Sequence, residues 1–190
     1  MPMPPQTAAW IIQLLWLVFC AYWLINAFHN KKTVYRPAWL VQRGYLLPLI
    51  IFGVIVTHWL PSRRVCPLSL TGQTVGIVLC AAGVVLAIWA RKILGKNWSG
   101  NPEIKADHEL IRSGPYGVVR HPIYTGLLLG IFGSIITLWP TWRGILWLVL
   151  SLAFIAVRVR QEEALMTHQF PDGYAAYRKS VRWALLPYII

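Results

Sequence analysis

Residues 123–157 read IYTGLLLGIFGSIITLWPTWRGILWLVLSLAFIAV and are apolar almost throughout. An α-helix needs about 20 predominantly apolar residues to cross the hydrocarbon core of a bilayer. The stretch is therefore long enough for two short crossings, and its polar, proline-containing segment 140–143 is the natural place for a turn. We predict spans at 123–139 and 144–157, the second extendable to Arg158, joined as a tight helical hairpin.

The rest of the chain shares this apolar character. Of its 190 residues, 57% are hydrophobic and 13% are charged, whereas an ordinary soluble domain has about 25% charged residues. So few charges cannot cover a water-soluble globule, and so much apolar surface excludes disorder. Three further spans are expected within residues 8–94, at 8–28, 45–60 and 75–90. The sequence thus predicts an all-α integral membrane protein, a single domain with five transmembrane helices.

The charges predict how the chain crosses the membrane. The net charge of +12 reflects 18 Lys and Arg residues against 6 Asp and Glu. Membrane proteins concentrate Lys and Arg in cytoplasmic loops, so the excess favours a multi-pass topology over nucleic-acid binding. With five spans, fifteen of the 18 basic residues lie on one side, in segments 29–44, 91–122 and 158–190. We expect an outside N-terminus and a cytoplasmic C-terminus, with any active site on the cytoplasmic side, where all six acidic residues also lie.

Small residues mark one face of the span at 123–139. Gly126 and Gly130 form a GxxxG pattern in this span. Small residues let two helices approach closely in lipid. We expect this face to pack against the second helix of the hairpin, at 144–157.

The first polar segment, 95–122, reads GKNWSGNPEIKADHELIRSGPYGVVRHP. It is too long for a simple connector, and long irregular loops in compact proteins are often functional. Pro122 suits the first turn of the following helix, where a backbone N–H is not needed. His121 and Tyr124 are three residues apart, so both can point to the same side. The same features also fit a loop that contacts lipid headgroups, and the residues alone leave both interpretations open.

The second polar segment begins at the end of the hairpin. If the last span continues as a helix past the bilayer, Arg158 and Glu162 are i, i+4 neighbours, and Glu163 is turned away from Glu162. They form either an ordinary ion pair or a charge pair that faces a ligand. Residues 170–174, FPDGY, indicate a turn. The apolar positions that follow predict an amphipathic helix that lies at the membrane interface or covers the loop as a lid: Tyr174, Tyr177 and Val181.

Common signatures of other chemistries are missing from the sequence. It has no HExxH, P-loop or GxGxxG pattern, and its three cysteines form no CxxC pair. His108 and His121 lie thirteen residues apart without an acidic ligand pattern around them. We therefore expect no metal site.

Several runs together resemble the isoprenylcysteine carboxyl methyltransferase family of membrane methyltransferases, to which phospholipid methyltransferases are related. The runs are HELI at 108–111, SGPY at 113–116 and RHPIYTG at 120–126, followed by the Glu162–Glu163 pair. Phe170, Tyr174 and Tyr177 match the C-terminal element of that family, and the resemblance covers about residues 90–185. It implies a methyltransferase core at 95–190, made of a cofactor loop, the hairpin spans at 123–158 and a C-terminal lid helix.

The resemblance also implies a cofactor and roles for individual residues. S-adenosylmethionine is the expected methyl donor, and a lipophilic carboxylate such as a prenylated cysteine is the expected acceptor. Glu162 is expected to hold the cofactor, and Arg158 to bind the acceptor carboxylate; both are the expected catalytic residues. The other expected cofactor contacts are Asn101, His108, Glu109, Leu110, Ile111, Tyr116, His121, Pro122, Ile123 and Tyr124. The interpretation requires His121 and Glu162 to lie close together on one side of the membrane.

Three other functions compete with this interpretation. An amine or phospholipid N-methyltransferase on the same scaffold would need a base to remove a proton from its acceptor, and the sequence offers Glu163 or His121. A sterol-type membrane reductase would use NADPH, whose extra phosphate calls for basic residues such as Arg112 and Lys105. A non-catalytic membrane scaffold is the third. Binding of S-adenosylmethionine, its demethylated product or NADPH separates these classes.

Overall fold

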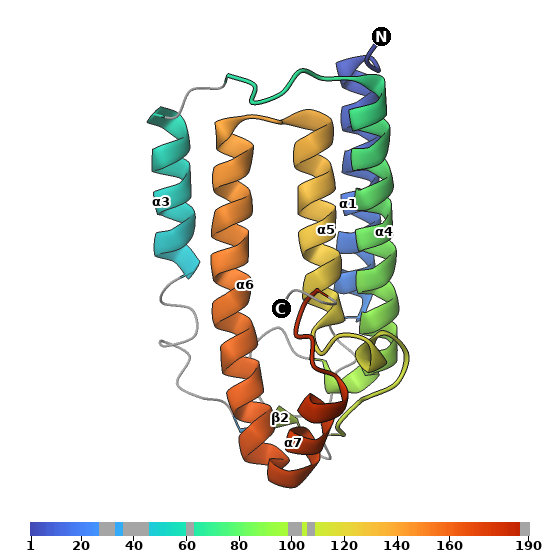
Figure 1. The fold of residues 1–190 in the computed structure, drawn as a ribbon, viewed down its shortest axis with the longest axis vertical. Helices are drawn as coiled ribbons and strands as arrows, with labels where there is room; N and C mark the ends of the chain where they lie inside the picture. Colours follow the sequence, from blue (N-terminus) through green and yellow to red (C-terminus); the bar gives the residue numbers. More distant parts are fainter. Residues whose placement is uncertain (27–32, 36–45, 60–62, 99–103, 106–108, 187–190) are drawn as a thin grey trace.

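The computed structural model describes residues 1–26, 33–35, 46–59, 63–98, 104–105 and 109–186. The helices run side by side as a bundle, with the polar C-terminal region at one end (Figure 1). The elements in chain order are α1 (Pro5–Asn26), β1 (Thr33–Tyr35), α3 (Leu46–Trp59), α4 (Leu70–Leu94), the short 3₁₀ helix η1 (Gly95–Asn97), β2 (Ile104–Lys105), the 3₁₀ helix η2 (Gly114–Gly117), α5 (Pro122–Leu138), α6 (Trp142–Gln169) and α7 (Pro171–Ser180).

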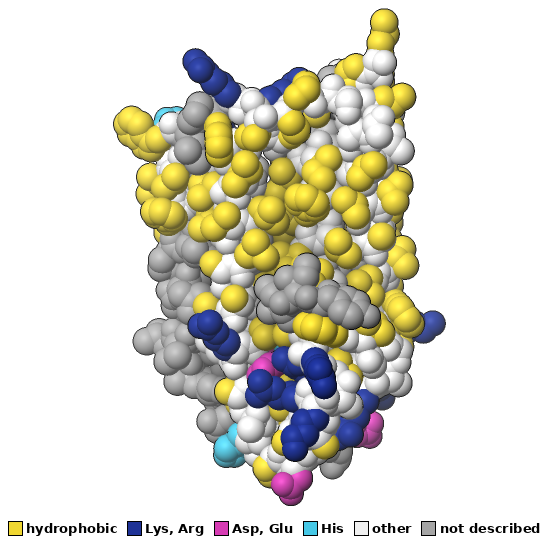
Figure 2. All heavy atoms as spheres, viewed as in Figure 1, with side chains coloured by type: hydrophobic (Ala, Val, Ile, Leu, Met, Phe, Trp, Pro, Cys, Tyr) yellow, Lys and Arg dark blue, Asp and Glu magenta, His cyan; other side chains and the backbone are white. Residues whose placement is uncertain are grey.

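Five apolar helices within the described ranges correspond to the five predicted spans. Three of them are long and apolar enough to cross a membrane, namely Gln6–Asn26, Leu70–Asn97 and Trp142–Gln169. The other two are shorter, with 17 residues in α5 and 14 in α3. Hydrophobic side chains cover the bundle over most of its height, and the charged side chains gather mainly at its polar end (Figure 2). An apolar outer surface is what a bilayer requires of a helix bundle.

The described residues also contain a short β pairing, which an all-α architecture does not include. β1 and β2 pair antiparallel, with Thr33 opposite Lys105 and Tyr35 opposite Ile104. The pairing joins the segment after α1 to the segment after η1. It lies near the polar end of the bundle.

The small-residue face of α5 packs against α4, not against α6 as the sequence suggested. A Cβ added to Gly126 would lie 2.5 Å from the carbonyl oxygen of Gly83, and one added to Gly133 would lie 2.5 Å from the backbone nitrogen of Cys80. Real Cβ atoms do not approach backbone this closely, so the two helices are in backbone contact. The GxxxG pattern indicated a close helix contact correctly, but it carries no information about the partner.

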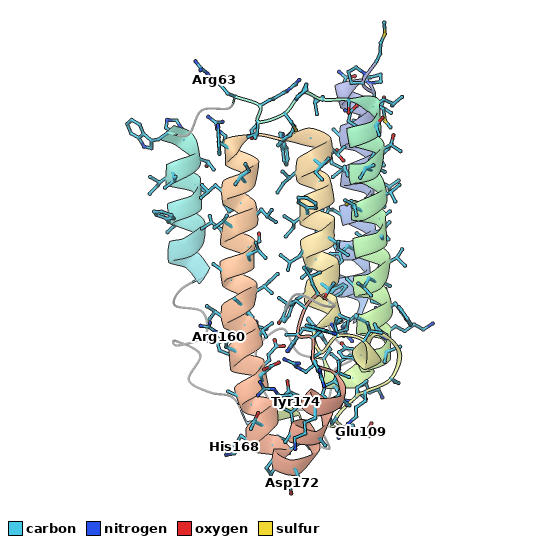
Figure 3. The ribbon with its side chains drawn as sticks, viewed as in Figure 1. Arg63, Glu109, Arg160, His168, Asp172 and Tyr174 are labelled. Carbon is cyan, nitrogen blue, oxygen red and sulfur yellow. The ribbon has the colours of Figure 1, made fainter. Side chains whose placement is uncertain are left out.

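The end of the bundle away from the polar region is held by the segments before α4 and between α5 and α6. Val65 donates its backbone N–H to the carbonyl of Pro140 over 2.6 Å, and Arg64 forms an isolated bridge with Thr141. The side chains of Ser69 and Thr141 cap α4 and α6 by accepting from Gly72 N and Gly144 N. Arg63 therefore lies at the far end of the molecule from Tyr174 and Asp172 (Figure 3).

α6 continues through 28 residues and carries its polar part beyond the start of α5. Phe170 ends α6 and begins α7, and Pro171 is the first residue of α7, where the missing N–H costs nothing. The buried face of α7 packs with Leu110, Met166 and Phe170, and it consists of Tyr174, Tyr177 and the following Val181. α7 thus folds back over the loop, which is the lid arrangement of the two that the sequence left open.

Candidate active site

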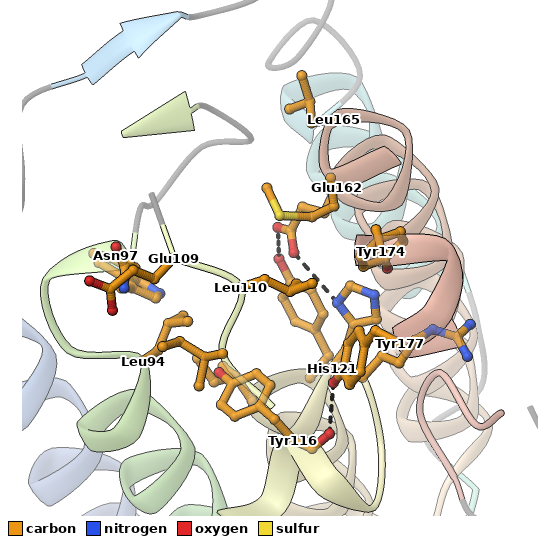
Figure 4. Close-up of a pocket in the computed structure, with 16 residues that line it drawn as sticks. Leu94, Asn97, Glu109, Leu110, Tyr116, His121, Glu162, Leu165, Tyr174 and Tyr177 are labelled. Carbon is orange, nitrogen blue, oxygen red and sulfur yellow. Dashed lines mark hydrogen bonds and ion pairs between the residues drawn. The ribbon is translucent and has the colours of Figure 1, made fainter. Parts of the chain in front are cut away.

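A pocket opens at the polar end of the bundle, between the end of α4, the loop before α5, and α6 with α7 (Figure 4). Apolar and aromatic side chains form most of its wall, and a few polar groups converge in it. Its lining residues are Leu94, Asn97, Trp98, Glu109, Leu110, Ile111, Tyr116, Arg120, His121, Ile123, Tyr124, Glu162, Leu165, Met166, Tyr174 and Tyr177. A largely apolar cavity with a few placed polar groups is the usual form of a small-molecule site.

His121 stands immediately before α5 and faces two carboxylates. Its Nδ1 lies 3.6 Å from Glu162 Oε2, and its Nε2 lies 3.5 Å from Glu163 Oε1. The imidazole is 9% exposed and stacks over the Tyr124 ring, with 5.9 Å between the ring centroids. His121 and Glu162, which lie in separate polar segments of the sequence, therefore meet in one pocket.

Glu162 accepts hydrogen bonds from side chains of two helices, α5 and α6. Its Oε1 accepts from the Tyr124 hydroxyl and from Arg158 Nη2, the latter at 3.2 Å. Arg158 Nε also lies 3.3 Å from the Tyr124 hydroxyl. The Glu162 side chain stays 27% exposed, so the carboxylate is oriented by its neighbours and still presents surface to the pocket.

Glu163 is directed toward a different set of partners. Arg120 Nε donates to Glu163 Oε1 over 2.7 Å, and Arg178 Nε lies 3.8 Å from Glu163 Oε2. The adjacent carboxylates are thus separated by the turn of the helix, since Glu162 faces the pocket with Arg158 and Glu163 faces Arg120. His121 bridges the two groups.

The charges around His121 act on its ionisation. Burial alone would lower the pKa of the imidazole, but the carboxylates of Glu162 and Glu163 outweigh it and raise that pKa above its ordinary value. The protonated form of His121 is therefore favoured between the two carboxylates. A protonated imidazole cannot accept a proton, so the two carboxylates disfavour a role for His121 as a base.

The segment after α7 holds the Arg120–His121 dipeptide in place. The backbone N–H of Arg120 donates to the carbonyl of Trp183, and that of His121 to the carbonyl of Ala184, both over 2.9 Å. The Thr125 hydroxyl donates to the carbonyl of Leu185. Residues about 60 positions apart in sequence therefore fix the start of α5 and the direction of its first side chains.

α7 is joined to the loop by two further contacts. The Tyr177 hydroxyl donates to the carbonyl of Tyr116 over 2.7 Å, and Arg112 Nη2 donates to the carbonyl of Gly173 over 2.8 Å. Burial raises the pKa of Tyr177 to about 12, so its hydroxyl remains a donor across the physiological range. Arg112, which the reductase alternative would use for a phosphate, is occupied here in holding α7.

The structure brings most of the sequence-predicted site residues together. The pocket is lined by eight of them, Glu109, Leu110, Ile111, Tyr116, His121, Ile123, Tyr124 and Glu162. Pro122 is buried as the first residue of α5 and does not line the pocket. Arg158 lies beside the pocket, in contact with Glu162 and Tyr124. Asn101 and His108 lie outside the described residues.

Sequence reasoning missed two parts of the site. The end of α4 and η1 contributes Leu94, Asn97 and Trp98, and the turn of α6 after Glu162 contributes Leu165 and Met166. The NW pair at the start of the polar segment was a usable signal, since a tryptophan beside an amide is unusual in a solvated loop. Arg120 was counted as a basic loop residue, and nothing in its sequence context indicated its pairing with Glu163.

A bundle of apolar helices with a polar pocket at one end has the arrangement of an integral membrane enzyme. Comparison with known families shows which one. The chain belongs to the phospholipid methyltransferase family, whose model matches residues 71–173. This range contains α5, α6, all of α4 except its first residue, and the loop that lines the pocket, and membership implies a methyl donor.

The relatives in sequence are isoprenylcysteine methyltransferases. A probable protein-S-isoprenylcysteine O-methyltransferase of Oryza sativa subsp. indica is 24% identical over 98% of this chain and 100% of its own length. The protein-S-isoprenylcysteine O-methyltransferase of Mus musculus is 26% identical over 95% of this chain, which spans 65% of the mouse protein. These matches confirm the resemblance to the isoprenylcysteine carboxyl methyltransferase family.

A solved structure shares the fold. The structure of the eukaryotic intramembrane Ras methyltransferase ICMT matches with a TM-score of 0.57 and 22% identity, over 82% of this chain and 55% of that chain. The likeness supports an integral membrane fold for this chain.

Proposed function

We propose that this protein is an S-adenosylmethionine-dependent methyltransferase that methylates the carboxylate of a lipophilic substrate such as a prenylated cysteine. The observation that carries the proposal is the meeting of His121 and Glu162, 3.6 Å apart, in one pocket at the polar end of an apolar bundle. The relatives from rice and mouse are named for this reaction.

The pocket residues fit such a cofactor by their chemistry. The adenine base of the cofactor is planar and has apolar faces, and the pocket offers Leu94, Leu110 and Tyr116 for it. The amino acid part of the cofactor is charged, and the Glu162 carboxylate and the protonated form of His121 supply complementary charges on the other side. When bound, S-adenosylmethionine supplies a methyl group on a sulfonium sulfur, which is already activated for transfer.

Arg158 is the proposed partner of the acceptor carboxylate. Its guanidinium is 10% exposed and lies one turn of α6 closer to the apolar bundle than Glu162. A guanidinium suits a carboxylate because it can donate two parallel hydrogen bonds. A lipophilic acid that lies in the bilayer would reach Arg158 with its charged end while its tail stays among apolar side chains.

The ionisation of the pocket favours a carboxylate over an amine as acceptor. A carboxylate is ionised at neutral pH and needs no base, whereas an ammonium must lose a proton before it can accept a methyl group. Glu162 and Glu163 raise the pKa of His121 and so favour its protonated form, which cannot accept a proton, and Glu163 is paired with Arg120. The contribution of the chain is then to position the acceptor and to exclude water.

The proposal includes an arrangement in the membrane. We propose five membrane-spanning helices, α1, α3, α4, α5 and α6, with α5 and α6 as a hairpin and the pocket on the cytoplasmic side. The chain would act as a single membrane domain, with residues 95–190 as the methyltransferase core. The distribution of Lys and Arg residues supports this orientation.

The test uses the full chain purified in detergent. We expect it to bind S-adenosylmethionine and S-adenosylhomocysteine but not NADPH, and to transfer labelled methyl groups to N-acetyl-S-farnesylcysteine. The matched control is the same compound with its carboxylate replaced by an amide, which should accept no methyl group. Binding of NADPH without S-adenosylhomocysteine would overturn the proposal in favour of a reductase.

The family match to a phospholipid methyltransferase model favours a second candidate, methylation of a lipid amine. The two products differ in chemistry, because a methyl ester is released by mild base and an N-methyl group is not. Vesicles that contain phosphatidylethanolamine therefore provide the competing substrate. Base-stable label on the lipid would replace the carboxylate proposal with this candidate.

A further inference from the structure

Asn97 is a buried polar residue in the pocket that neither the sequence reasoning nor the network around Glu162 uses. It is the last residue of η1 and is 8% exposed. Within the part of the chain that the structure describes, its side-chain Oδ1 is buried and has no hydrogen-bond partner. A buried acceptor without a donor costs free energy, so its retention in a pocket indicates that a ligand supplies the donor.

The backbone around Asn97 is held by hydrogen bonds, which fix the position of its side chain in the pocket. Arg91 Nη1 donates to the carbonyl of Gly95 over 2.6 Å, and its Nη2 donates to the carbonyl of Asn26 over 3.1 Å. Gly95 has a φ of 55°, which lets the chain turn sharply into η1. The start of the pocket wall is thus tied to both α1 and α4.

Trp98, next to Asn97, is fixed from two sides. The Arg91 guanidinium carbon lies 4.5 Å from the centroid of the Trp98 ring, and the Trp23 ring meets it edge to face at 6.2 Å. An arginine over an indole face is an attractive cation–π contact. Asn97 and Trp98 therefore form a rigid corner of the pocket that combines an amide with an aromatic side chain.

This corner lies away from the charged cluster. In Figure 4, Asn97 is beside Glu109 on one side of the pocket, and His121 and Glu162 are on the other. The apolar side chain of Leu110 lies between the two sides. The pocket thus presents the amide of Asn97, with Glu109 and apolar side chains near it, on one side and the His121–Glu162 pair on the other.

We propose that Asn97 is a ligand-contact residue that recognises the hydrogen-bonding edge of the adenine base of the cofactor. The inference rests on the proposed use of S-adenosylmethionine. It means that Asn97 sets the orientation of the adenine base in the pocket. A carboxamide has an acceptor and a donor side by side, and it can accept from the exocyclic amine of adenine while donating to the ring nitrogen N7.

The other parts of the cofactor match the corner less well. A sulfonium has no N–H to donate, so it cannot satisfy Asn97 Oδ1. An ammonium group is better matched by a carboxylate, Glu162 or Glu109, than by the neutral amide of Asn97. The flat apolar faces of adenine fit beside apolar lining residues such as Leu94 and Trp98, the neighbour of Asn97 in sequence.

The experiment measures the binding of two matched ligands to the full chain in detergent by calorimetry. S-adenosylhomocysteine carries the exocyclic amine, and S-inosylhomocysteine carries a carbonyl oxygen in its place. We expect the wild type to bind the adenosyl compound at least about tenfold more tightly, since two facing acceptors are left unpaired with the inosyl compound. Asn97→Ala should weaken the adenosyl compound by about tenfold and leave the inosyl compound nearly unchanged.

Two further variants keep the result interpretable. Lys96→Ala changes an exposed residue of the same 3₁₀ turn and should preserve the wild-type preference between the ligands. Asn97→Asp has the size of asparagine and keeps an acceptor for the amine but loses the donor, so its loss of adenosyl binding should be smaller than that of Asn97→Ala.

The outcomes separate this inference from the proposed function. If the wild type binds S-adenosylhomocysteine but Asn97→Ala weakens both ligands equally or neither, the role of Asn97 is refuted and the proposed function stands. If the wild type binds neither ligand, both the proposed function and the role of Asn97 are refuted. A collapse of the preference in Asn97→Ala alone supports the inference.

Discussion

The α4–α5 interface and the polar end of the bundle show two different ways of holding a membrane protein together. Between α4 and α5, glycines bring the two backbones into contact, and a Cβ on Gly126 would lie 2.5 Å from the Gly83 carbonyl. At the polar end, Glu163 of α6 lies 2.7 Å from Arg120 Nε and 3.5 Å from His121 Nε2. The first region stabilises the fold by close packing alone, whereas the second combines stabilising contacts with the proposed active site. Substitutions should therefore separate the two.

The largest effect is expected at the helix contact. Gly126→Val inserts a branched side chain against the α4 backbone and should destabilise the protein by about 3 kcal/mol or more. Thermal unfolding in detergent measures this, and activity should fall only with the amount of folded protein. Phe132→Ala is the control on the same helix, because Phe132 is 42% exposed on the outer surface. A Gly126→Val protein with wild-type stability would show that the close contact is not needed.

Arg158→Ala tests whether the polar end contributes to transfer independently of cofactor binding. It removes the proposed partner of the acceptor carboxylate and should lower methyl transfer by about 100-fold or more, as expected for loss of a buried charged hydrogen bond. Binding of S-adenosylhomocysteine should change by no more than a few-fold. The exposed Arg160, two residues further along α6, provides the control variant Arg160→Ala. Equal loss of binding and transfer would instead assign Arg158 to the cofactor.

Glu162→Ala should show the opposite division. It removes the carboxylate that faces the pocket and leaves Arg158 and His121 without their shared partner, so binding of S-adenosylhomocysteine should weaken by about 100-fold. Calorimetry with the purified variant measures this, and His168→Ala, at an exposed site on the same helix, is the control. Unchanged binding would contradict the proposed role of Glu162.

The smallest effect is a pH dependence of stability that comes from His121. Its pKa is raised in the folded protein by Glu162 and Glu163, so its contribution to stability is complete below the unfolded value of about 6.5 and is lost as the pH rises through the higher folded value. We expect wild type to exceed His121→Asn in melting temperature most clearly at pH 6, with the gap narrowing at alkaline pH. A gap that widens with pH would mean that His121 is neutral in the fold.

The sequence predicted the helices better than their contacts. The apolar stretches located α1, α3, α4, α5 and α6, because burial in lipid demands a continuous apolar run. The partner of the Gly126 face was wrong, since a small-residue pattern specifies a close approach and not a direction. The β1–β2 pairing was missed because two or three residues carry no periodic signal.

The site was predictable where a local pattern carried its chemistry. Pro122 after His121 indicated a helix start, and the i, i+4 spacing of Arg158 and Glu162 indicated their ion pair, which the structure forms at 3.2 Å. The place of Asn97 was not predictable, because it depends on how Arg91 and the end of α1 hold the turn. The pairing of Arg120 with Glu163 likewise depends on tertiary structure that no local spacing encodes.

The hydrogen bonds from Arg120 and His121 to Trp183 and Ala184 determine when the pocket can be completed during synthesis of the chain. His121 is synthesised about 60 residues before Trp183 and Ala184, whose backbone carbonyls accept these hydrogen bonds. Helices can enter the bilayer one after another as they emerge, yet the pocket is completed only when residue 184 has left the ribosome. We expect a chain that ends before Trp183 to insert into the membrane but to lack a complete pocket.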